Sequence, residues 1–278
     1  MRERTMAADD ARSILEVRNL NSFYGRRQVL EDISFRVPAG KVTVIMGVSG
    51  CGKSTLLRHL IGLKPTDPAQ IFVDGKDLAA FDSREMEAYR KRIGVLFQAG
   101  ALFNSMTVRD NIAVPLRVHT RLAEPTISIM VRIKLHQVGL TRFADYMPSQ
   151  LSGGMRKRAG LARALAMDPE ILFVDEPSSG LDPITAAGLD DLILELREAM
   201  GMTLIVVTHE LESAFRIADQ LIVLDQGRVL AVGPPESIRE SRDERVVQFL
   251  SRRADERARD QDGYLAELLA AAGGRDRS

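Results

Sequence analysis

The amino-acid sequence predicts an α/β fold with a parallel-sheet core, an antiparallel layer and a helical insertion. Short, largely apolar runs of strand length alternate with amphipathic helices, which is typical of parallel strands buried on both faces. These runs are VTVIM (42–46), ILFVD (171–175) and TLIVVT (203–208). Residues 14–24 and 28–37 instead alternate apolar and polar side chains with period two, the pattern of antiparallel strands. From 83 to about 165 the periodicity is mostly helical.

The remaining elements follow from the same patterns. A glycine-rich turn and an amphipathic helix over 54–62 come directly after the first buried strand. Residues 70–78 are expected to form another antiparallel strand and turn, and 185–199 a helix between two buried strands. Residues 221–233 are predicted to be two strands joined by a turn at Gln226-Gly227. Because strand, helix and strand alternate, the buried strands should be parallel.

We divide the chain into three parts. A polar N-terminal segment, 1–13, precedes one α/β domain over 14–240, whose helical subdomain spans about 84–165. The tail, 241–278, is rich in charge, and we expect one or two short amphipathic helices there, although a solvated, frayed end is the alternative. The apolar clusters of the tail are VVQFL (246–250) and YLAELL (264–269).

Composition restricts the class of protein. The 278 residues are 45% hydrophobic and 27% charged, the mixture of a globular protein with an ample core. A net charge of zero and 5% aromatic residues argue against nucleic acid as a partner. The single cysteine, Cys51, forms no internal disulfide, so we expect a reducing compartment. We find no secretory signal and no apolar run of the roughly 20 residues that a membrane helix needs, so we expect a cytoplasmic chain that is peripheral to the membrane through a partner.

Residues 47–55, GVSGCGKST, fit the phosphate-loop pattern G-x-x-x-x-G-K-[ST] between a strand and a helix. Glycines let successive N–H groups of such a loop point inward, and the following helix adds its positive dipole end. Lys53 should bind the β- and γ-phosphates of ATP, and the Ser54 hydroxyl is a suitable Mg²⁺ ligand. A chance glycine-rich turn would not need the strand and the helix on either side. The predicted nucleotide-binding residues of this loop are Gly47, Ser49, Gly50, Cys51, Gly52, Lys53, Ser54 and Thr55.

Three further polar residues follow buried strands. Asp175 and Glu176 end the strand at 171–175, at the edge where α/β sheets bind ligands. Asp175 is expected to hold Mg²⁺, and Glu176 to lie near an attacking water molecule. His209 follows the strand at 203–208; a lone histidine is more often structural, but here it could reach the γ-phosphate.

Ser152-Gly153-Gly154 opens a second helix and makes a second anion site, because a serine cap and free N–H groups attract phosphate. One chain cannot easily fold this start over its own phosphate loop. A second copy in head-to-tail orientation can. Two chains would then enclose two ATP molecules with C₂ symmetry, and ATP hydrolysis would let the two chains separate.

Over residues 14–240 the ordered set of motifs resembles the ATP-binding subunits of ABC transporters. GVSGCGKST resembles the Walker A loop and ILFVDE (171–176) the Walker B strand, while LSGGM (151–155) stands at the signature and SSGLD (178–182) at the D-loop. His209 is at the switch position. The resemblance implies a P-loop NTPase fold (ABC ATPase) with a RecA-like parallel-sheet core, an antiparallel β subdomain and an inserted α-helical subdomain.

The resemblance also implies residue roles. Glu176 would be the general base of ATP hydrolysis, and Gln98, at the Q-loop position, would touch Mg²⁺ and sense the membrane partner. Tyr24, before Gly25, matches the aromatic residue that stacks on adenine. Ser152, Gly153 and Gly154 would act on the nucleotide of the other subunit, whose site Asp182 would also line.

Four stretches resemble a narrower group, the ATPases of MCE-type lipid transporters and Mla-like systems. They are LSGGM-x-[RK]-R-[AV], FQ-x-GALF (97–103), DPIT (182–185) and DERVVQFL (243–250). This group implies two ATPase copies on a two-copy permease, with a periplasmic MCE-domain protein and a small STAS-domain regulator on the helical region. Met155 departs from the usual LSGGQ, which removes a polar side chain near the opposite nucleotide.

Other functions remain open at this point. A soluble ABC ATPase without a permease, such as one for Fe–S assembly, and a transporter of a non-lipid substrate share the main motifs. A metabolic kinase would leave 152–154, 178–182 and His209 unexplained. The partner surface is expected within 99–116, where Leu102, Phe103 and Met106 could be exposed; the alternative is that they are core residues.

Overall fold

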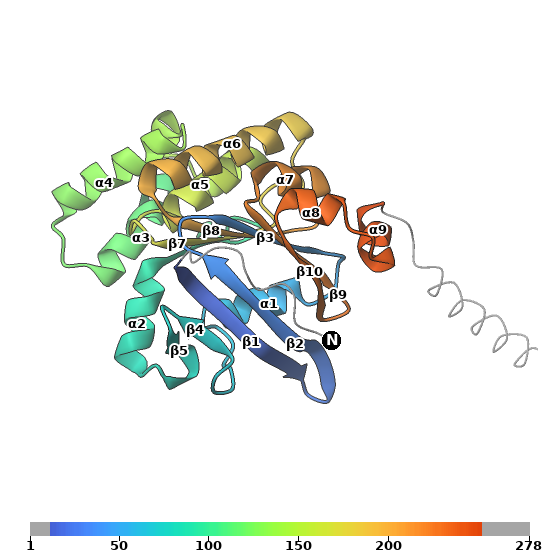
Figure 1. The fold of residues 1–278 in the computed structure, drawn as a ribbon. Coiled ribbons are helices and arrows are strands. Elements are labelled where there is room, and N and C mark those ends of the chain that lie inside the picture. Colours follow the sequence, from blue (N-terminus) through green and yellow to red (C-terminus); the bar gives the residue numbers. More distant parts are fainter. Residues whose placement is uncertain (1–11, 252–278) are drawn as a thin grey trace, which may run out of the picture.

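The computed structural model describes residues 12–251 as three layers (Figure 1). A six-stranded sheet lies in the middle, a smaller antiparallel sheet lies below it, and a layer of helices covers its upper face. The predicted fold class is confirmed, including the parallel core and the antiparallel layer.

The central sheet has the order β10-β9-β3-β8-β7-β6. Every neighbouring pair is parallel except β9 and β10, which form an antiparallel hairpin. Every residue of β3 and β8 is buried, because helices cover one face and the second sheet with α1 covers the other. The strands are β3 (Val42–Gly47), β6 (Ile93–Leu96), β7 (Ile171–Asp175), β8 (Thr203–Thr208), β9 (Gln220–Asp225) and β10 (Arg228–Gly233).

The antiparallel sheet has the order β2-β1-β4-β5. Its long hairpin joins Tyr24 to Arg27, at the predicted break in the period-two pattern. Helix α1 (Lys53–Leu60) lies between the two sheets, and its leucines share one core with both of them. The strands are β1 (Ser13–Tyr24), β2 (Arg27–Pro38), β4 (Ile71–Val73) and β5 (Lys76–Asp77).

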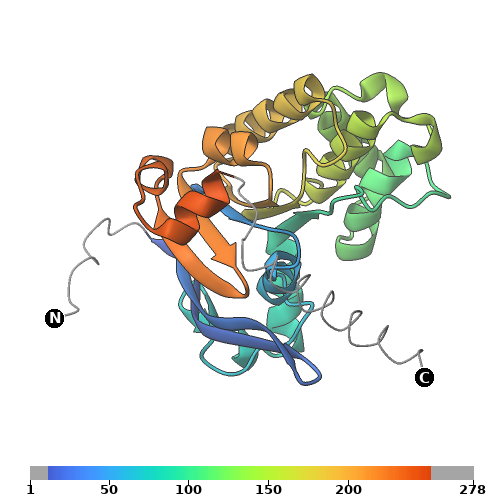
Figure 2. The same cartoon turned by 90° about the vertical axis from the view of Figure 1, so that its right-hand side faces the viewer.

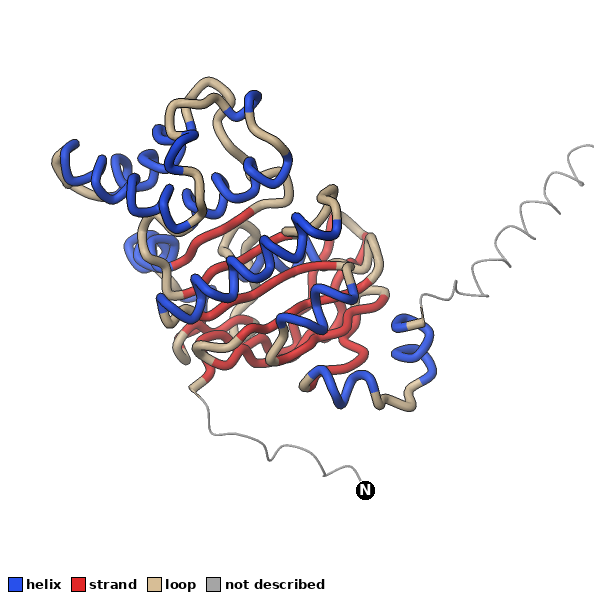
Figure 3. Tube along the Cα trace, turned by 90° about the horizontal axis from the view of Figure 1, so that it is seen from above, coloured by secondary structure: helices blue, strands red, loops and turns tan. Residues whose placement is uncertain are grey.

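Three helices form the layer above the sheet: α5 (Gly153–Ala164), α6 (Pro183–Met200) and α7 (Leu211–Ile217). Seen from above, helices lie over the strands of the sheet (Figure 3). Their buried residues share a core with alternate residues of the strands, such as Val44 and Val206. Because these strands are parallel, they all end at one edge of the sheet, beside the starts of the helices. The site lies at that edge.

The stretch from 83 to 165 is not helical throughout, so the expectation was wrong over Ile93–Leu96. These residues form β6 between α2 (Ser83–Arg92) and the later helices. Gly94 explains the placement, because a Cβ there would collide with the backbone oxygen of Ala164, and the strand can pass under α5 only as glycine. The contact is not local, and no periodicity in the sequence indicates it.

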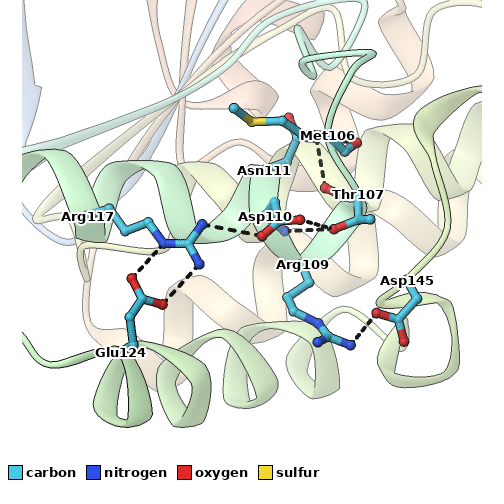
Figure 4. Close-up of polar contacts among 8 residues, drawn as sticks. All are labelled: Met106, Thr107, Arg109, Asp110, Asn111, Arg117, Glu124 and Asp145. Carbon is cyan, nitrogen blue, oxygen red and sulfur yellow. Dashed lines mark hydrogen bonds and ion pairs between the residues drawn. The ribbon is translucent and has the colours of Figure 1, made fainter.

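Helices α3 (Val108–His119) and α4 (Glu124–Gln137) pack on each other and extend beyond the β6 edge of the sheet (Figures 1 and 2). Arg117 joins the two helices, because its guanidinium pairs with Glu124 at 2.8 Å and with Asp110 at 3.3 Å (Figure 4). Short 3-10 helices complete the chain path at η1 (Leu78–Ala80), η2 (Thr141–Phe143) and η3 (Pro148–Gln150).

After β10 the chain forms α8 (Pro235–Arg239) and α9 (Glu244–Leu250), so the first expected helix of the tail is present. The second expected helix, around 264–269, and most of the N-terminal segment lie outside the described residues. Within residues 12–251 no helix is both long enough and apolar enough to cross a bilayer.

Candidate functional site

A cavity of about 370 Å³ opens where β3, β7 and β8 end. Parallel strands end at one edge of their sheet, so residues far apart in the sequence meet there. The cavity brings together the phosphate loop, the two carboxylates, the glutamine and the histidine that the sequence singled out. Its lining residues are Val29, Ser49, Gly50, Gly52, Lys53, Ser54, Thr55, Gln98, Asp175, Glu176 and His209.

The phosphate loop links β3 to α1. Gly52 caps the helix with φ 109°, a backbone conformation that favours glycine, and a Cβ there would lie 2.5 Å from a methyl group of Leu30. No side chain caps the start of α1, so its first backbone N–H groups are left for another acceptor. A helix start of this kind attracts a phosphate group.

The Lys53 ammonium is held at the loop by two backbone oxygens. Its Nζ donates to the carbonyl of Gly47 at 2.8 Å and to that of Val48 at 3.1 Å. The side chain is buried and lines the cavity. It therefore carries a positive charge to the wall of the cavity, where an anion would meet it.

The two carboxylates differ in their surroundings. Burial raises the pKa of Asp175, and repulsion from Glu176 adds to this, while Lys53, Arg58 and Lys157 act in the opposite direction. Glu176 Oε2 lies 2.8 Å from His209 Nδ1, so the carboxylate and the imidazole form a hydrogen-bonded pair at the cavity. The backbone of Glu176 has φ 49°, which is unusual for a residue other than glycine.

Gln98 follows β6 and connects two motifs. Its Nε2 donates to Ser179 Oγ at 3.3 Å, within the SSGLD segment. Ser54, Gln98 and Asp175 thus supply oxygen atoms to one cavity, and oxygen ligands of this kind suit Mg²⁺ when phosphate and water complete the shell. In the described part of the chain no three His, Cys, Asp or Glu residues form a metal-binding group, so a metal would depend on the nucleotide as well.

Tyr24 does not line the cavity. It stands half-exposed at the end of β1, with Lys64 Nζ 4.2 Å from its ring centroid and its hydroxyl accepting from Arg58 at 3.1 Å. The bond from Arg58 lowers the pKa of the Tyr24 hydroxyl, and Thr55 contributes to this. Lys64 covers one ring face, so stacking on a base would use the other face.

The second helix start is also separate from the cavity. Ser152 caps α5, because its Oγ accepts from the backbone of Met155 at 3.2 Å, and Asp182 caps α6 in the same way. The two caps are neighbours, since a Cβ on Gly154 would lie 2.6 Å from Thr185 Cγ2. Ser152 and Asp182 are exposed, whereas Gly153 is half-buried. These residues do not contact the cavity of their own chain.

Sequence reasoning missed two residues near the cavity. Val29 of β2 lines the cavity, and nothing in its period-two strand indicates this. Lys157 is buried and contacts Glu176; its position three residues after the buried Gly154 places it on the inner face of α5 and could have indicated it. The side chain of Cys51, a predicted nucleotide-binding residue, is 3% exposed and does not line the cavity, because it turns back toward Gly47.

A family model described as ABC transporter matches residues 30–179 of this chain. The intermembrane phospholipid transport system ATP-binding protein MlaF of Haemophilus influenzae is 44% identical over 243 residues, which cover 87% of this chain and 92% of that protein. MlaF of Escherichia coli is 43% identical, with 87% and 90% covered. The probable ribonucleotide transport ATP-binding protein mkl of Mycobacterium tuberculosis is 42% identical over 239 residues, with 86% and 67% covered.

Solved structures agree. The structure of cbiO1 from Clostridium perfringens, part of the ABC transporter complex cbiONQ, superposes with a TM-score of 0.76 and 29% identity, covering 92% of this chain and 99% of that one. A dimer of the ATP-binding cassette MJ0796 in a post-hydrolysis state with ADP and Pi has a TM-score of 0.72 and 30% identity, covering 80% and 98%.

Proposed function

This chain belongs to the ABC transporter family as an ATP-binding, ATP-hydrolysing subunit, and from that premise we propose that it drives phospholipid transport between the inner and outer membranes of a bacterium. The observation that supports the cargo most strongly is the 44% identity with MlaF over most of both chains. We propose that a membrane permease holds the chain at the cytoplasmic face of the inner membrane. An MCE-domain protein and a STAS-domain regulator would complete the assembly.

The arrangement of the cavity suggests how hydrolysis proceeds. We propose that Lys53 and the N–H groups at the start of α1 bind the β- and γ-phosphates, while Ser54, Gln98 and Asp175 hold Mg²⁺. Bound Mg²⁺ would neutralise charge on the phosphates. Glu176 would accept a proton from the attacking water, with His209 fixing the carboxylate and meeting the γ-phosphate.

The exposed caps support a dimer in which each chain completes the site of the other. Ser152 and Asp182 are exposed at the surface and do not contact their own cavity. A head-to-tail partner would bring its own Ser152, Gly153 and Gly154 to the γ-phosphate and its D-loop to the site. Tyr24 would stack on adenine at the outer end of the same nucleotide, and Val29 would pack nearby.

The loop after Gln98 is our candidate for permease docking. Asn111 is fully buried and holds this loop together. Its amide nitrogen donates to the backbone oxygens of Met106 and Thr107 (Figure 4) and of Phe103, and its amide oxygen accepts from Phe103 N at 2.7 Å. Phe103 is 49% exposed and Met106 is exposed too. A rigid loop with exposed apolar side chains, directly after the glutamine of the site, suits a partner that must respond to ATP.

The test is affinity purification of the tagged full-length protein from detergent-solubilised native membranes, with mass spectrometry of proteins and lipids. A helical permease together with an MCE-domain protein and phospholipid is the expected result. Recovery of a permease with a different accessory protein, or with ribonucleotides, would contradict the lipid cargo. The absence of any membrane protein would favour a soluble ABC ATPase such as an Fe–S assembly factor.

A further inference from the structure

Lys157 connects the signature helix to the catalytic strand of its own chain. It lies on α5, one turn after Ser152-Gly153-Gly154, and is 6% exposed. Its Nζ donates to the backbone oxygen of Glu176 at 2.8 Å. A buried ammonium needs a partner, and here that partner is the peptide of the residue that holds the reactive carboxylate.

The backbone of Glu176 needs to be held. Its φ of 49° lies in the left-handed region, which a residue with a side chain rarely adopts. Three hydrogen bonds hold the backbone of this residue: its N–H donates to Val207 of β8 at 2.8 Å, and its carbonyl accepts from Lys157 at 2.8 Å and from the backbone N–H of Ser179 at 3.3 Å. This backbone turn directs the carboxylate to His209, 2.8 Å away. Without Lys157, the carbonyl of Glu176 keeps only the longer contact with the Ser179 N–H, and its own N–H keeps the contact with β8.

The chain contains a second buried lysine that serves as a comparison. Lys134 of α4 is 4% exposed, and its ammonium pairs with Asp168 at 2.6 Å, remote from the cavity. Lys134 has an ordinary ion-pair partner, the carboxylate of an exposed aspartate. Lys157 instead donates to a strained main chain within the site, an arrangement that fixes geometry as well as satisfying a charge.

We propose that Lys157 is a positioning residue for ATP hydrolysis. It links the signature helix to the backbone of Glu176 and thereby fixes the orientation of the Glu176 carboxylate. The inference rests on the proposed role of Glu176 as general base. A nucleotide bound by the partner presses on the Ser152 end of α5, and Lys157 lies on the same helix, so a shift of α5 moves the contact with Glu176. The site of one chain thereby responds to the nucleotide held at its own signature.

The experiment compares steady-state ATP hydrolysis and Mg-ATP affinity in full-length variants. Lys157→Met keeps the length of the side chain and removes the donor. Because a misplacement of about 1 Å can cost on the order of a hundredfold in rate, we expect kcat to fall by about tenfold to a hundredfold with ATP affinity unchanged. Lys157→Arg restores a donor and should recover most of the lost turnover. Lys134→Met, the matched buried control, should lower the unfolding temperature and leave kcat at the wild-type value.

Three results would overturn the inference. One is wild-type kcat in Lys157→Met; another is a loss of ATP affinity parallel to the loss of kcat, which indicates a structural role only. The third is an arginine variant as slow as the methionine variant. If Lys157→Met does not fold, Lys157→Ala and Lys157→Arg replace it under the same criteria. Glu176→Gln distinguishes failure of the proposed function from failure of the inference about Lys157. If Glu176→Gln hydrolyses ATP at the wild-type rate, both fail. If Glu176→Gln is inactive while Lys157→Met is fully active, only the inference is overturned.

Discussion

The Cys51 side chain faces away from the cavity although the residue belongs to the phosphate loop. The side chain is buried against Gly47. Burial raises the pKa of the thiol, so less of the reactive thiolate is present at neutral pH.

We therefore predict that a maleimide labels Cys51 at least about tenfold more slowly in the native protein than in denaturant, because only the exposed thiolate reacts. Mass spectrometry of timed samples measures both rates. Equal rates would show that the loop opens to expose the thiol. Protection should persist without ATP, since the fold itself covers the sulfur.

His59 is a second buried residue with a measurable signature. It lies on α1 at 2% exposure, with Nε2 2.9 Å from Ser22 Oγ. Lys64 Nζ donates to the same hydroxyl at 2.6 Å, so the serine proton is available to His59. Burial lowers the pKa of His59 to about 4, and the nearby Lys64 ammonium acts in the same direction.

This pKa predicts the direction of a pH effect on stability. The unfolded histidine gains a proton near pH 6.5, whereas the folded one resists it until about pH 4. The stabilisation is complete above about pH 6.5 and is lost as the pH falls toward 4, by about 3 kcal/mol in total. Urea unfolding of the wild type and of His59→Gln between pH 7 and 4 measures it. The variant should lose less stability over this range, and equal losses would refute the assignment.

At the scale of elements, the loop between β6 and α3 carries one residue suited to bind a partner and one that stabilises the fold. Phe103 is exposed, with the Arg163 guanidinium 5.9 Å from its ring, while its neighbour Leu102 packs against the core. The sequence left open whether Leu102, Phe103 and Met106 are exposed or belong to the core; Phe103 and Met106 are exposed, and Leu102 packs against the core. Adjacent residues face opposite environments because Asn111 folds the backbone between them and the helix.

Phe103→Asp should abolish co-purification with the permease and change the free energy of unfolding by less than about 0.5 kcal/mol, as expected at an exposed position. Leu102→Asp should instead destabilise the fold by about 1–3 kcal/mol, because a carboxylate would be buried. Val118→Asp, at a 67% exposed apolar position on α3, is the matched control and should keep the permease bound. Retention of the permease by Phe103→Asp would place docking elsewhere.

The same elements show what a sequence can reveal. The buried strands and the long hairpin were predictable because their patterns are local. The phosphate loop, Asp175, Glu176 and His209 were predictable as one cavity, because parallel strands end at one edge. Gln98 was predicted from the family resemblance alone. Strand β6 was missed, since four residues carry too little periodicity and its fit under α5 depends on a distant contact at Gly94. The bond from Lys157 to Glu176 likewise joins residues that only the packed helix layer brings together.

At the scale of the whole molecule, we propose that each chain contributes one half of each of two nucleotide sites. The phosphate loop and carboxylates open at the cavity, and Ser152 and Asp182 are exposed outside it. A solved relative of the same fold is a dimer with ADP and Pi, which supports this reading. ATP binding would then close two chains around two nucleotides, and hydrolysis would let the chains separate. This closing and opening is the motion that would drive the permease.

The most direct test is sedimentation of the Glu176→Gln protein with and without Mg-ATP. Since this variant should bind Mg-ATP but lose water activation, we predict a species of twice the single-chain mass with ATP and a monomer without it. Gly154→Val in the same background, which would push on Thr185 and distort the helix start, should bind ATP and stay monomeric. A monomer at saturating ATP in the Glu176→Gln protein would contradict the shared-site account.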